Sequence, residues 1–416
     1  MYYLLFFIYL LLCSWALGRI SFFNKSGLPA PVILSLFVLK ITAGLVLGWL
    51  FKTYYGQGND YWDLNEYGIR EYDLLVKDPL VFFTNIFDSG YTSPGGFFDS
   101  TGSFWNDLEN NILIKALGLF NIFSRGNYYI NSLFFNFLGF FGHVALYKVF
   151  ADIYPTKKYQ VIAGCFLLPS SLLFTSGITR DNVIFTLLCL FCYGIFFSMQ
   201  HGFTRRRTIL MILSFSGILL MRNYVAFILL PGLAGWLLSS FNPGRKTWVF
   251  IGTYVGVLLL AISLSILLPS MDPAKIIAQK QSDFLALGVA NTQIQMDTLA
   301  PTTASLLRNA PQAFNHGFLR PWLFDFGNVF TVMQAVELYF YIVLVLFCFA
   351  GCFRKKSLSG YHPFVPFIVL ASCLALLLIG YIVPNTNSIV RYRSIYLPFL
   401  ITPVLCVISF KRHSNT

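Results

Sequence analysis

Charged residues are scarce in this chain. Asp, Glu, Lys and Arg make up 11% of its 416 residues, whereas they make up about 25% of an average soluble domain. Hydrophobic residues account for 56%, and the mean hydropathy is +0.67. This composition excludes an ordinary soluble protein and predicts a protein with several membrane spans.

Cysteine is missing from every segment that we expect to be aqueous. All eight cysteines lie within or at the edge of predicted spans: Cys13, Cys165, Cys189, Cys192, Cys348, Cys352, Cys373 and Cys406. A disulfide framework or a zinc site would need cysteine outside the membrane, so we expect neither. The close spacing of Cys189 and Cys192 is interpreted as helix packing.

Apolar windows of about 17 to 22 residues recur along the chain, which is the length that a helix needs to cross a hydrocarbon core of ~30 Å. The alternating pattern of a membrane β-barrel is not found. The windows lie near residues 2–18, 30–51, 128–150, 159–175, 182–200, 208–221, 223–240, 248–268, 331–352, 363–383 and 394–410. We therefore predict an all-α, polytopic transmembrane helix bundle of about eleven spans, forming one integral membrane domain over residues 1–416.

Acidic residues are outnumbered by basic ones, 17 to 29. Lys and Arg concentrate in alternate short loops, for example Arg205 to Arg207 and Arg354 to Lys356. Because basic loops prefer the cytoplasmic side, this predicts an N-terminus outside and a C-terminus inside the cytoplasmic membrane. The net charge of +12 is interpreted as orientation and contact with anionic membrane lipids, with no nucleic acid as partner.

Two longer segments interrupt the rhythm of short loops. Residues 52–127 and 269–330 are predicted to be the first and second outer loop regions. The stretch "GNDYWDLNEYGIREYDLLVKDPLVFF" has the aromatic and acidic pattern of a helix lying along the membrane interface. In the second region, "DPAKIIAQKQSDFLALG" also predicts a helix.

Five arginines lie at the predicted outer ends of spans: Arg180, Arg222, Arg320, Arg391 and Arg393. A charge at membrane depth costs ~2.5–3.5 kcal/mol on insertion scales, so it is usually paired or lines a polar cavity. Guanidinium groups bind phosphate bidentately, which predicts a site for the phosphate of a lipid-linked substrate. Alternatively, the arginines reach lipid headgroups or pair with carboxylates such as Asp181, which can also cap the helix that follows.

Carboxylates come directly after the second span. Asp60 and Asp63 lie in "GQGNDYWD" and are candidates for the general base that activates an acceptor hydroxyl. We prefer Asp60, because Gly56 and Gly58 allow a ligand to approach closely. A solvated acidic loop is the alternative. The pair is not a DxD motif, so no metal ligand is assigned, although a divalent cation is left open as a cofactor.

Histidines are few, and His316 is the only one in the predicted outer loops. It can act as an acid or a base, or be a loop histidine with satisfied hydrogen bonds. Within the spans, His143 is expected to be hydrogen-bonded in the core, and Lys40 to reach the inner surface or to pair within the bundle. Gly44 and Gly48 predict a helix contact.

These features together resemble the polytopic membrane proteins of bacterial surface-polysaccharide loci. The acid after a span, "PSSLLFTSGITRDN", "LLMRNY" and the final "RYRSIYLPFLITP" are similar to the GT-C superfamily of polyprenyl-phosphate-dependent glycosyltransferases. The resemblance implies that Asp60, or alternatively Asp63, is the catalytic acid of the first outer loop. It also implies that Arg391 and Arg393 hold the lipid phosphate.

The predicted function is therefore that of a membrane glycosyltransferase. It would move a sugar from a polyprenyl-linked donor to a glycan or lipid-linked acceptor on the outer face of the bacterial inner membrane. The chain departs from the family in an additional span and in lacking a paired-acid motif. This leaves open an O-antigen or polysaccharide polymerase or ligase. A lipid-glycan flippase or other transporter is the third alternative.

Overall fold

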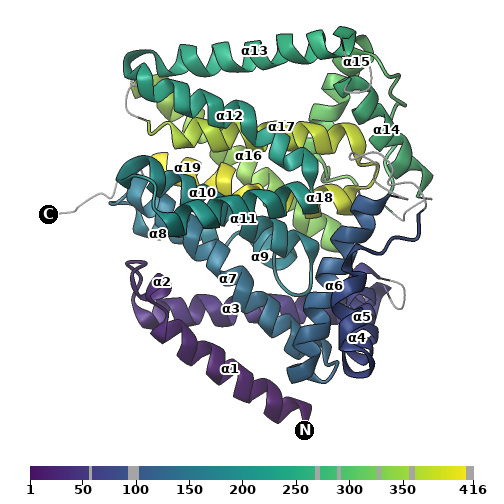
Figure 1. Cartoon of the computed structure of the whole chain (residues 1–416). Coiled ribbons are helices and arrows are strands. Elements are labelled where there is room, and N and C mark those ends of the chain that lie inside the picture. Colours follow the sequence, from purple (N-terminus) through teal and green to yellow (C-terminus); the bar gives the residue numbers. More distant parts are fainter. Residues whose placement is uncertain are drawn as a thin grey trace, which may run out of the picture. The chain divides into compact units, whose positions relative to one another are not determined.

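A computed structural model describes residues 1–55, 59–91, 103–267, 272–287, 292–325, 329–355 and 361–408 of the chain (Figure 1). Over these ranges the structure is helical, and the only β-type pairing is an isolated bridge between Gln293 and Asn385. The prediction of an all-α fold is confirmed. The chain divides into two compact units, Met1–Val149 with Ser171–Asn223, and Phe150–Ser170 with Tyr224–Thr416. We call them the first and the second unit.

The first unit contains most of the N-terminal half. Its helices are α1 (Tyr2–Arg19), α2 (Ser21–Asn24), α3 (Ala30–Leu50), η1 (Phe51–Tyr55), α4 (Asp60–Lys77), α5 (Pro79–Thr84), η2 (Asn85–Phe87), α6 (Phe104–Ser124), α7 (Tyr128–Ile153, to Val149), α9 (Pro169–Phe174, from Ser171), α10 (Arg180–His201) and α11 (Arg205–Met221). The helix predicted at residues 58–83 is present as α4 and α5, with a break at Asp78; its place at the membrane interface stays a prediction.

The second unit contains the remaining helices. They are α8 (Lys158–Phe166), α12 (Asn223–Phe241), η3 (Pro243–Arg245), α13 (Lys246–Leu267), α14 (Pro273–Ala286), α15 (Thr303–Phe314), η5 (Asn315–Leu319), α16 (Val329–Lys355), α17 (Phe364–Ile382), α18 (Thr386–Ser394) and α19 (Leu397–Val407). The helix predicted around residues 272–288 is α14.

Eight helices of the described residues are long and apolar enough to cross a membrane, or nine if the bent pair of α18 and α19 is one span. The predicted count of about eleven is not reproduced. Residues 159–175 form two short helices, because Pro169 begins α9 and the residue before a proline disfavours helical geometry. The predicted span at 208–221 is α11, which has only 17 residues. The last span bends by 62° between α18 and α19.

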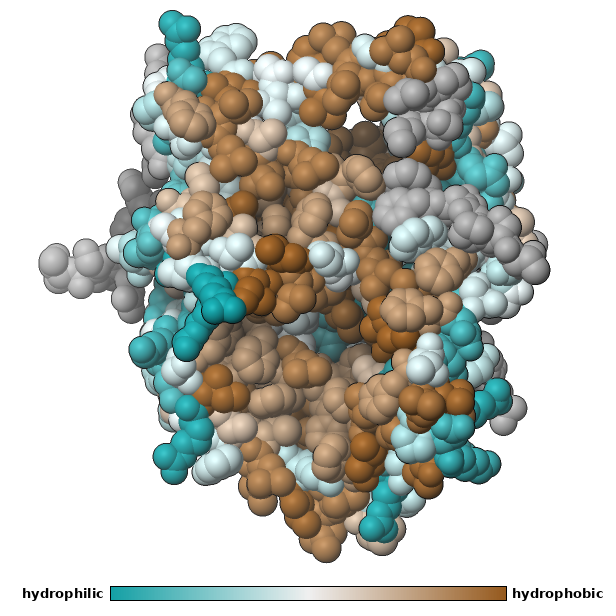
Figure 2. All heavy atoms as spheres, viewed as in Figure 1, coloured by the Kyte–Doolittle hydropathy of each residue, from teal (hydrophilic) through white to brown (hydrophobic). Residues whose placement is uncertain are grey.

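Burial separates central helices from peripheral ones. Of their apolar windows, 72% is buried in α7 and 61% in α10, but only 6% in α1 and in α13. The visible surface over α1 and α13 is largely hydrophobic (Figure 2). Exposed apolar side chains on helices of this length suit contact with lipid.

Close approach of helices within each unit depends on small residues. A Cβ on Gly44 would lie 2.3 Å from Nδ2 of Asn136, and one on Gly48 would lie 2.3 Å from the Tyr128 ring. The helix contact predicted for Gly44 and Gly48 is therefore confirmed, with α7 as the partner of α3. In the second unit, a Cβ on Gly380 would lie 1.9 Å from the carbonyl oxygen of Ala313, which brings α15 and η5 against α17.

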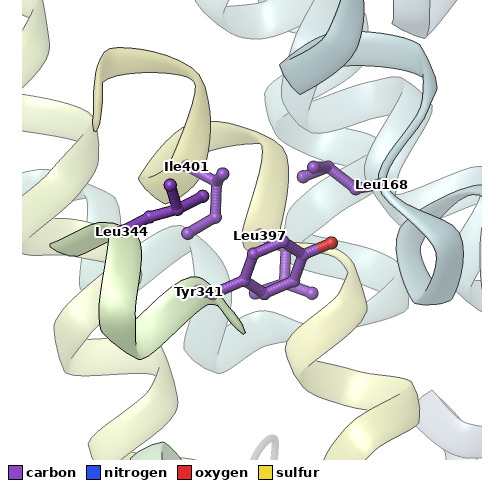
Figure 3. Close-up of a cluster of buried hydrophobic side chains, with 5 residues drawn as sticks. All are labelled: Leu168, Tyr341, Leu344, Leu397 and Ile401. Atoms are coloured by element: carbon purple, nitrogen blue, oxygen red, sulfur yellow. The ribbon is translucent and has the colours of Figure 1, made fainter. Parts of the chain in front are cut away.

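Part of the core of the second unit is a cluster of five apolar side chains from α16, α19 and the α8–α9 connection. Its members are Leu168, Tyr341, Leu344, Leu397 and Ile401 (Figure 3). Each is at most 8% exposed. The cluster packs α16 against α19.

Candidate functional site

Arg180 and Asp181 are the first two residues of α10, and each forms an ion pair with another helix or its end. Thr179 caps α10, because its Oγ1 accepts a hydrogen bond from the Asn182 main-chain nitrogen at 2.9 Å. Asp181 lies in the first turn of α10, where the helix dipole favours a negative charge. Its Oδ1 accepts a hydrogen bond from Arg222 Nη2 at 2.7 Å, and its side chain has no exposed surface. Asp181 thus both stabilises the helix start and holds Arg222 at the end of α11.

Arg180 points toward α6. Its Nη2 donates a hydrogen bond to Oδ1 of Asn110, and its Nε lies 3.6 Å from a carboxylate oxygen of Glu109. Its side chain is 34% exposed. Unlike Arg222, Arg180 is accessible enough to exchange its partners for a ligand.

The start of α4 is fastened to the end of α3. The Trp62 indole nitrogen donates to the Gly48 carbonyl at 3.0 Å, and its ring stacks on Tyr128 at 4.2 Å between centroids. Lys52 Nζ lies 4.5 Å from the centroid of the same indole. These contacts hold the first turn of α4, and with it Asp63, at the end of α3.

The two candidate bases occupy this first turn. Asp60 is the first residue of α4 and Asp63 is half-buried one turn later. The side chain of Asp60 lies outside the described part of the structure. Both carboxylates remain predicted bases.

The second unit holds the other three arginines. Arg393, at the end of α18, is 3% exposed. Its Nη1 donates to the carbonyl oxygens of Arg320 at 2.6 Å and Gly317 at 3.5 Å, and its Nε has no hydrogen-bond partner. Among the described residues, Arg393 forms no ion pair. Arg391 is half-buried and its guanidinium carbon lies 5.8 Å from the centroid of the Tyr392 ring.

His316 lies on the η5 turn that receives these Arg393 bonds. It is 2% exposed, and its Nδ1 has no hydrogen-bond partner. Burial and the positive charge of Arg320 lower the pKa of His316 below its usual 6.5, although a hydrogen bond with the Gly380 backbone opposes the shift. The imidazole is therefore mainly neutral near pH 7 and able to accept a proton.

Several buried polar atoms around η5 are unsatisfied. Arg320 Nε and Asn315 Oδ1 lack partners, as do Arg393 Nε and His316 Nδ1. The guanidinium of Arg320 has only a long ion pair, 3.8 Å, with Asp325. Because an unsatisfied buried polar atom costs about 1–3 kcal/mol, such a group is a good candidate for binding a polar ligand.

Sequence reasoning did not select Glu337 as a site residue. Its carboxylate accepts hydrogen bonds from the Ser170 main-chain nitrogen and hydroxyl, each at 3.0 Å, and from the Tyr341 hydroxyl at 2.5 Å. Glu337 also interacts electrostatically with Arg393. The signal available in the sequence was a carboxylate inside an apolar span, which is rare without a function or a partner.

The structure brings the predicted residues together in two groups. Arg180, Asp181 and Arg222 gather in the first unit, and His316, Arg320 and Arg393 in the second. His143, expected to be hydrogen-bonded, is 1% exposed, and its Nε2 lies 3.2 Å from Nζ of Lys40. Lys40 therefore pairs within the bundle.

Comparisons with known proteins give no relative. No family model, curated protein or solved structure matches the chain. Within the described ranges, no group of three or more His, Cys, Asp or Glu residues is arranged to hold a metal ion.

Proposed function

We propose that this protein is an integral membrane glycosyltransferase that uses a polyprenyl-phosphate or polyprenyl-diphosphate sugar as its donor. The acceptor is a glycan or a lipid-linked glycan on the outer face of the cytoplasmic membrane. Arg393 carries the proposal. Its guanidinium is 3% exposed and its Nε has no hydrogen-bond partner. The Glu337 carboxylate acts on it electrostatically but forms no ion pair with it, so an anionic ligand would complete its environment.

The phosphate of a lipid-linked sugar is an anion suited to this position. Arg393 Nε is an unused donor, and Arg320 Nε is a second one on the neighbouring turn. Two guanidinium donors match the oxygens of a phosphate that gains charge as it leaves the sugar. The lipid tail keeps such a substrate in the membrane, close to arginines at the ends of spans.

The reaction needs a base as well as an anion site. The acceptor hydroxyl oxygen attacks the anomeric carbon, the bond from that carbon to the phosphate oxygen breaks, and the phosphate departs with the electron pair. In the glycosyltransferase assignment the base that takes the hydroxyl proton is Asp60 or Asp63 of the first unit, and the family resemblance, not the geometry of the site, selects it. Arg180, the first residue of α10, is 34% exposed and can supply further positive charge to a donor or acceptor phosphate. Arg222 acts on this arrangement through its ion pair with Asp181.

A polysaccharide polymerase or ligase is the second candidate, and His316 favours it. This buried, mainly neutral imidazole lies on the same turn as Arg320 and next to the bonds of Arg393. A base and an anion site within one unit are sufficient for glycosyl transfer between two lipid-linked glycans. In this case the proton passes to His316.

Transfer of labelled sugar from a polyprenyl-linked donor in reconstituted membranes tests the proposal. Arg393→Met is expected to lower the rate by about 100-fold or more, because one electrostatic donor at a leaving oxygen contributes ~10²–10³. Arg205→Met, which removes an exposed arginine at the start of α11, is the matched control and should retain the wild-type rate. Equal rates for Arg393→Met and wild type would contradict the anion site.

The base and the reaction class are separated in the same assay. Loss of about 10²–10⁴-fold in Asp60→Asn or Asp63→Asn, with one sugar added per acceptor, indicates the transferase. A comparable loss in His316→Gln, with a ladder of whole repeat units as product, indicates the polymerase. Absence of any transfer by wild-type protein, together with crosslinks that trap alternating access, would reject both in favour of a transporter.

A further inference from the structure

Lys40 is an ionisable residue in the membrane that the proposed reaction does not use. It lies near the middle of the 21-residue helix α3 and is 1% exposed. No described carboxylate forms an ion pair with it. A lysine at this depth is expensive and usually has a specific task.

The Lys40 ammonium binds the turn between α9 and α10, residues 175–179, from both sides. Its Nζ donates to the carbonyl oxygen of Thr175, directly after α9, and lies 3.4 Å from Oδ1 of Asn182 in the first turn of α10. The hydroxyl oxygen of Ser176, within the turn, lies 3.5 Å away. The fourth contact, at 3.2 Å, is with His143 Nε2, and either group can donate depending on the tautomer.

Ser176 and Asn182 use their hydrogen atoms in other hydrogen bonds, so that their oxygen atoms can accept from Lys40. The Ser176 hydroxyl donates to the Leu172 carbonyl at 2.6 Å. Asn182 Nδ2 donates to the carbonyls of Gly177 at 3.1 Å and Phe135 at 3.3 Å. Both side chains therefore present a lone pair to Nζ, and all three turn contacts of Lys40 have lysine as the donor.

The rest of the turn is held by neutral groups. Gly177 has a φ of +76°, and its nitrogen donates to Oδ1 of Asn136 at 2.9 Å. A Cβ on Gly44 would lie 2.9 Å from that same nitrogen, so α3 touches the turn directly. Lys40 lies one helical turn before Gly44, and its Nζ joins α3 to the residue after α9 and to the first turn of α10.

We propose that Lys40 is a positioning residue, which fixes the direction in which Arg180 and Asp181 leave the turn. Arg180 directly follows the turn, and Asp181 holds Arg222 at 2.7 Å. Because Nζ of Lys40 contacts both ends of the turn, it fixes the positions of Arg180 and of Asp181, and through Asp181 that of Arg222. The link to donor binding rests on the proposed function, whereas the ordering of the turn does not.

Hydrogen exchange of the full-length protein in lipid nanodiscs, followed by mass spectrometry, tests the ordering of the turn. Lys40→Met is close in size and lacks the donor. We expect amides in a peptide spanning residues 174–183 to exchange several-fold faster, because the variant loses the three hydrogen bonds that Nζ donates to both ends of the turn. Peptides from α14 and α15 serve as an internal reference and should be unchanged.

Lys115→Met is the matched control. Lys115 is also a buried lysine of the first unit, but it binds Glu71 at 2.9 Å and Asn85 at 2.6 Å, on α4 and η2. Its loss should raise exchange around α4 and leave residues 174–183 as in wild type. Wild-type exchange of that peptide in Lys40→Met, or the same increase in both variants, would overturn the proposal.

A milder variant covers the case in which Lys40→Met does not fold. Ser176→Ala removes one of the oxygens that accept a hydrogen bond from Lys40. We expect about a threefold rise in amide exchange, confined to residues 175–179. No rise there would count against the proposal. In the transfer assay, Lys40→Met should raise the KM for the lipid-linked donor more than it lowers kcat, whereas Lys115→Met should leave their ratio unchanged. Faster exchange without any transferase activity would reject the proposed function and keep the role of Lys40.

Discussion

Asp181 is the carboxylate with the most complete burial in the described ion pairs. It has no exposed side-chain surface, and its partner Arg222 is 11% exposed and 2.7 Å away. Removing one partner of a buried ion pair is much more destabilising than replacing both partners by apolar residues, because the remaining charge stays desolvated. The pair is therefore a structural requirement of the first unit, whatever ligand Arg222 also contacts.

Arg222→Met should lower the free energy of unfolding by about 3–5 kcal/mol, because it removes the positive charge that faces the buried Asp181 carboxylate at 2.7 Å. The double variant Arg222→Met with Asp181→Asn removes that charge and should recover part of the loss. Thermal unfolding in a mild detergent measures both.

The control for this experiment is the pair in the second unit. Arg320 and Asp325 are 3.8 Å apart with side chains 22% and 29% exposed. Arg320→Met should change the free energy of unfolding by at most about 1 kcal/mol, since solvent screens such pairs. A loss in Arg222→Met no larger than that in Arg320→Met would show that the burial of Asp181 is not costly.

At the scale of helices, packing of α3 on α7 depends on two glycines. At Gly44 an added Cβ would lie within 3.0 Å of both the Asn136 amide and the Gly177 main-chain nitrogen. The backbone atom cannot move aside cheaply, so the helix and the 175–179 turn must separate.

Gly44→Ala is expected to destabilise the protein by about 1–3 kcal/mol through overpacking. Gly252→Ala on α13 is the matched control, because nothing lies within 4 Å of its added Cβ. There, the better helix propensity of alanine should leave stability unchanged or raise it by up to about 1 kcal/mol. Equal effects of the two substitutions on the unfolding midpoint would contradict the contact between α3 and the turn.

The apolar windows at 2–18, 30–51, 128–150, 182–200, 223–240, 248–268, 331–352 and 363–383 correspond to the eight helices that can span a membrane. Length and hydropathy are sufficient to predict them. The break at Pro169 was not predicted, because it lies in continuous apolar sequence. The pairing of α19 with α18 across a bend was not predicted either, because α18 is polar and its sequence does not have the composition of a span. The mean hydropathy of a window reports its composition and does not indicate the residue at which the helical backbone is interrupted.

Side-chain partners were predicted less well than helices. Lys40 and His143 are 103 residues apart in sequence and 3.2 Å apart in space. Neither position reveals the other, since both lie alone in apolar surroundings. The five arginines were recognised as exceptional from their positions. Their division between two units, which separates Arg180 and Arg222 from the three that follow Tyr224, depends on packing that the positions do not indicate.

At the scale of the whole molecule, the orientation predicted from the basic loops has a direct test. Reporter fusions in a bacterial host distinguish the two sides, because alkaline phosphatase is active only outside and green fluorescent protein fluoresces mainly inside. We expect fluorescence for a fusion after residue 25, in the basic stretch that follows α1, and phosphatase activity for one after residue 302. The reverse pattern would place both arginine groups on the cytoplasmic side and remove the basis for a donor on the outer face.

The helix comprising η3 and α13 has 25 residues and only 6% of its apolar window is buried. At 1.5 Å per residue it measures about 37 Å, which exceeds a hydrocarbon thickness of ~30 Å. Such a helix tilts in a thin bilayer and stands more upright in a thick one. The acyl-chain length of the surrounding lipids therefore sets the inclination of α13, and with it the angle at which the chain continues from Leu267 into the second outer region.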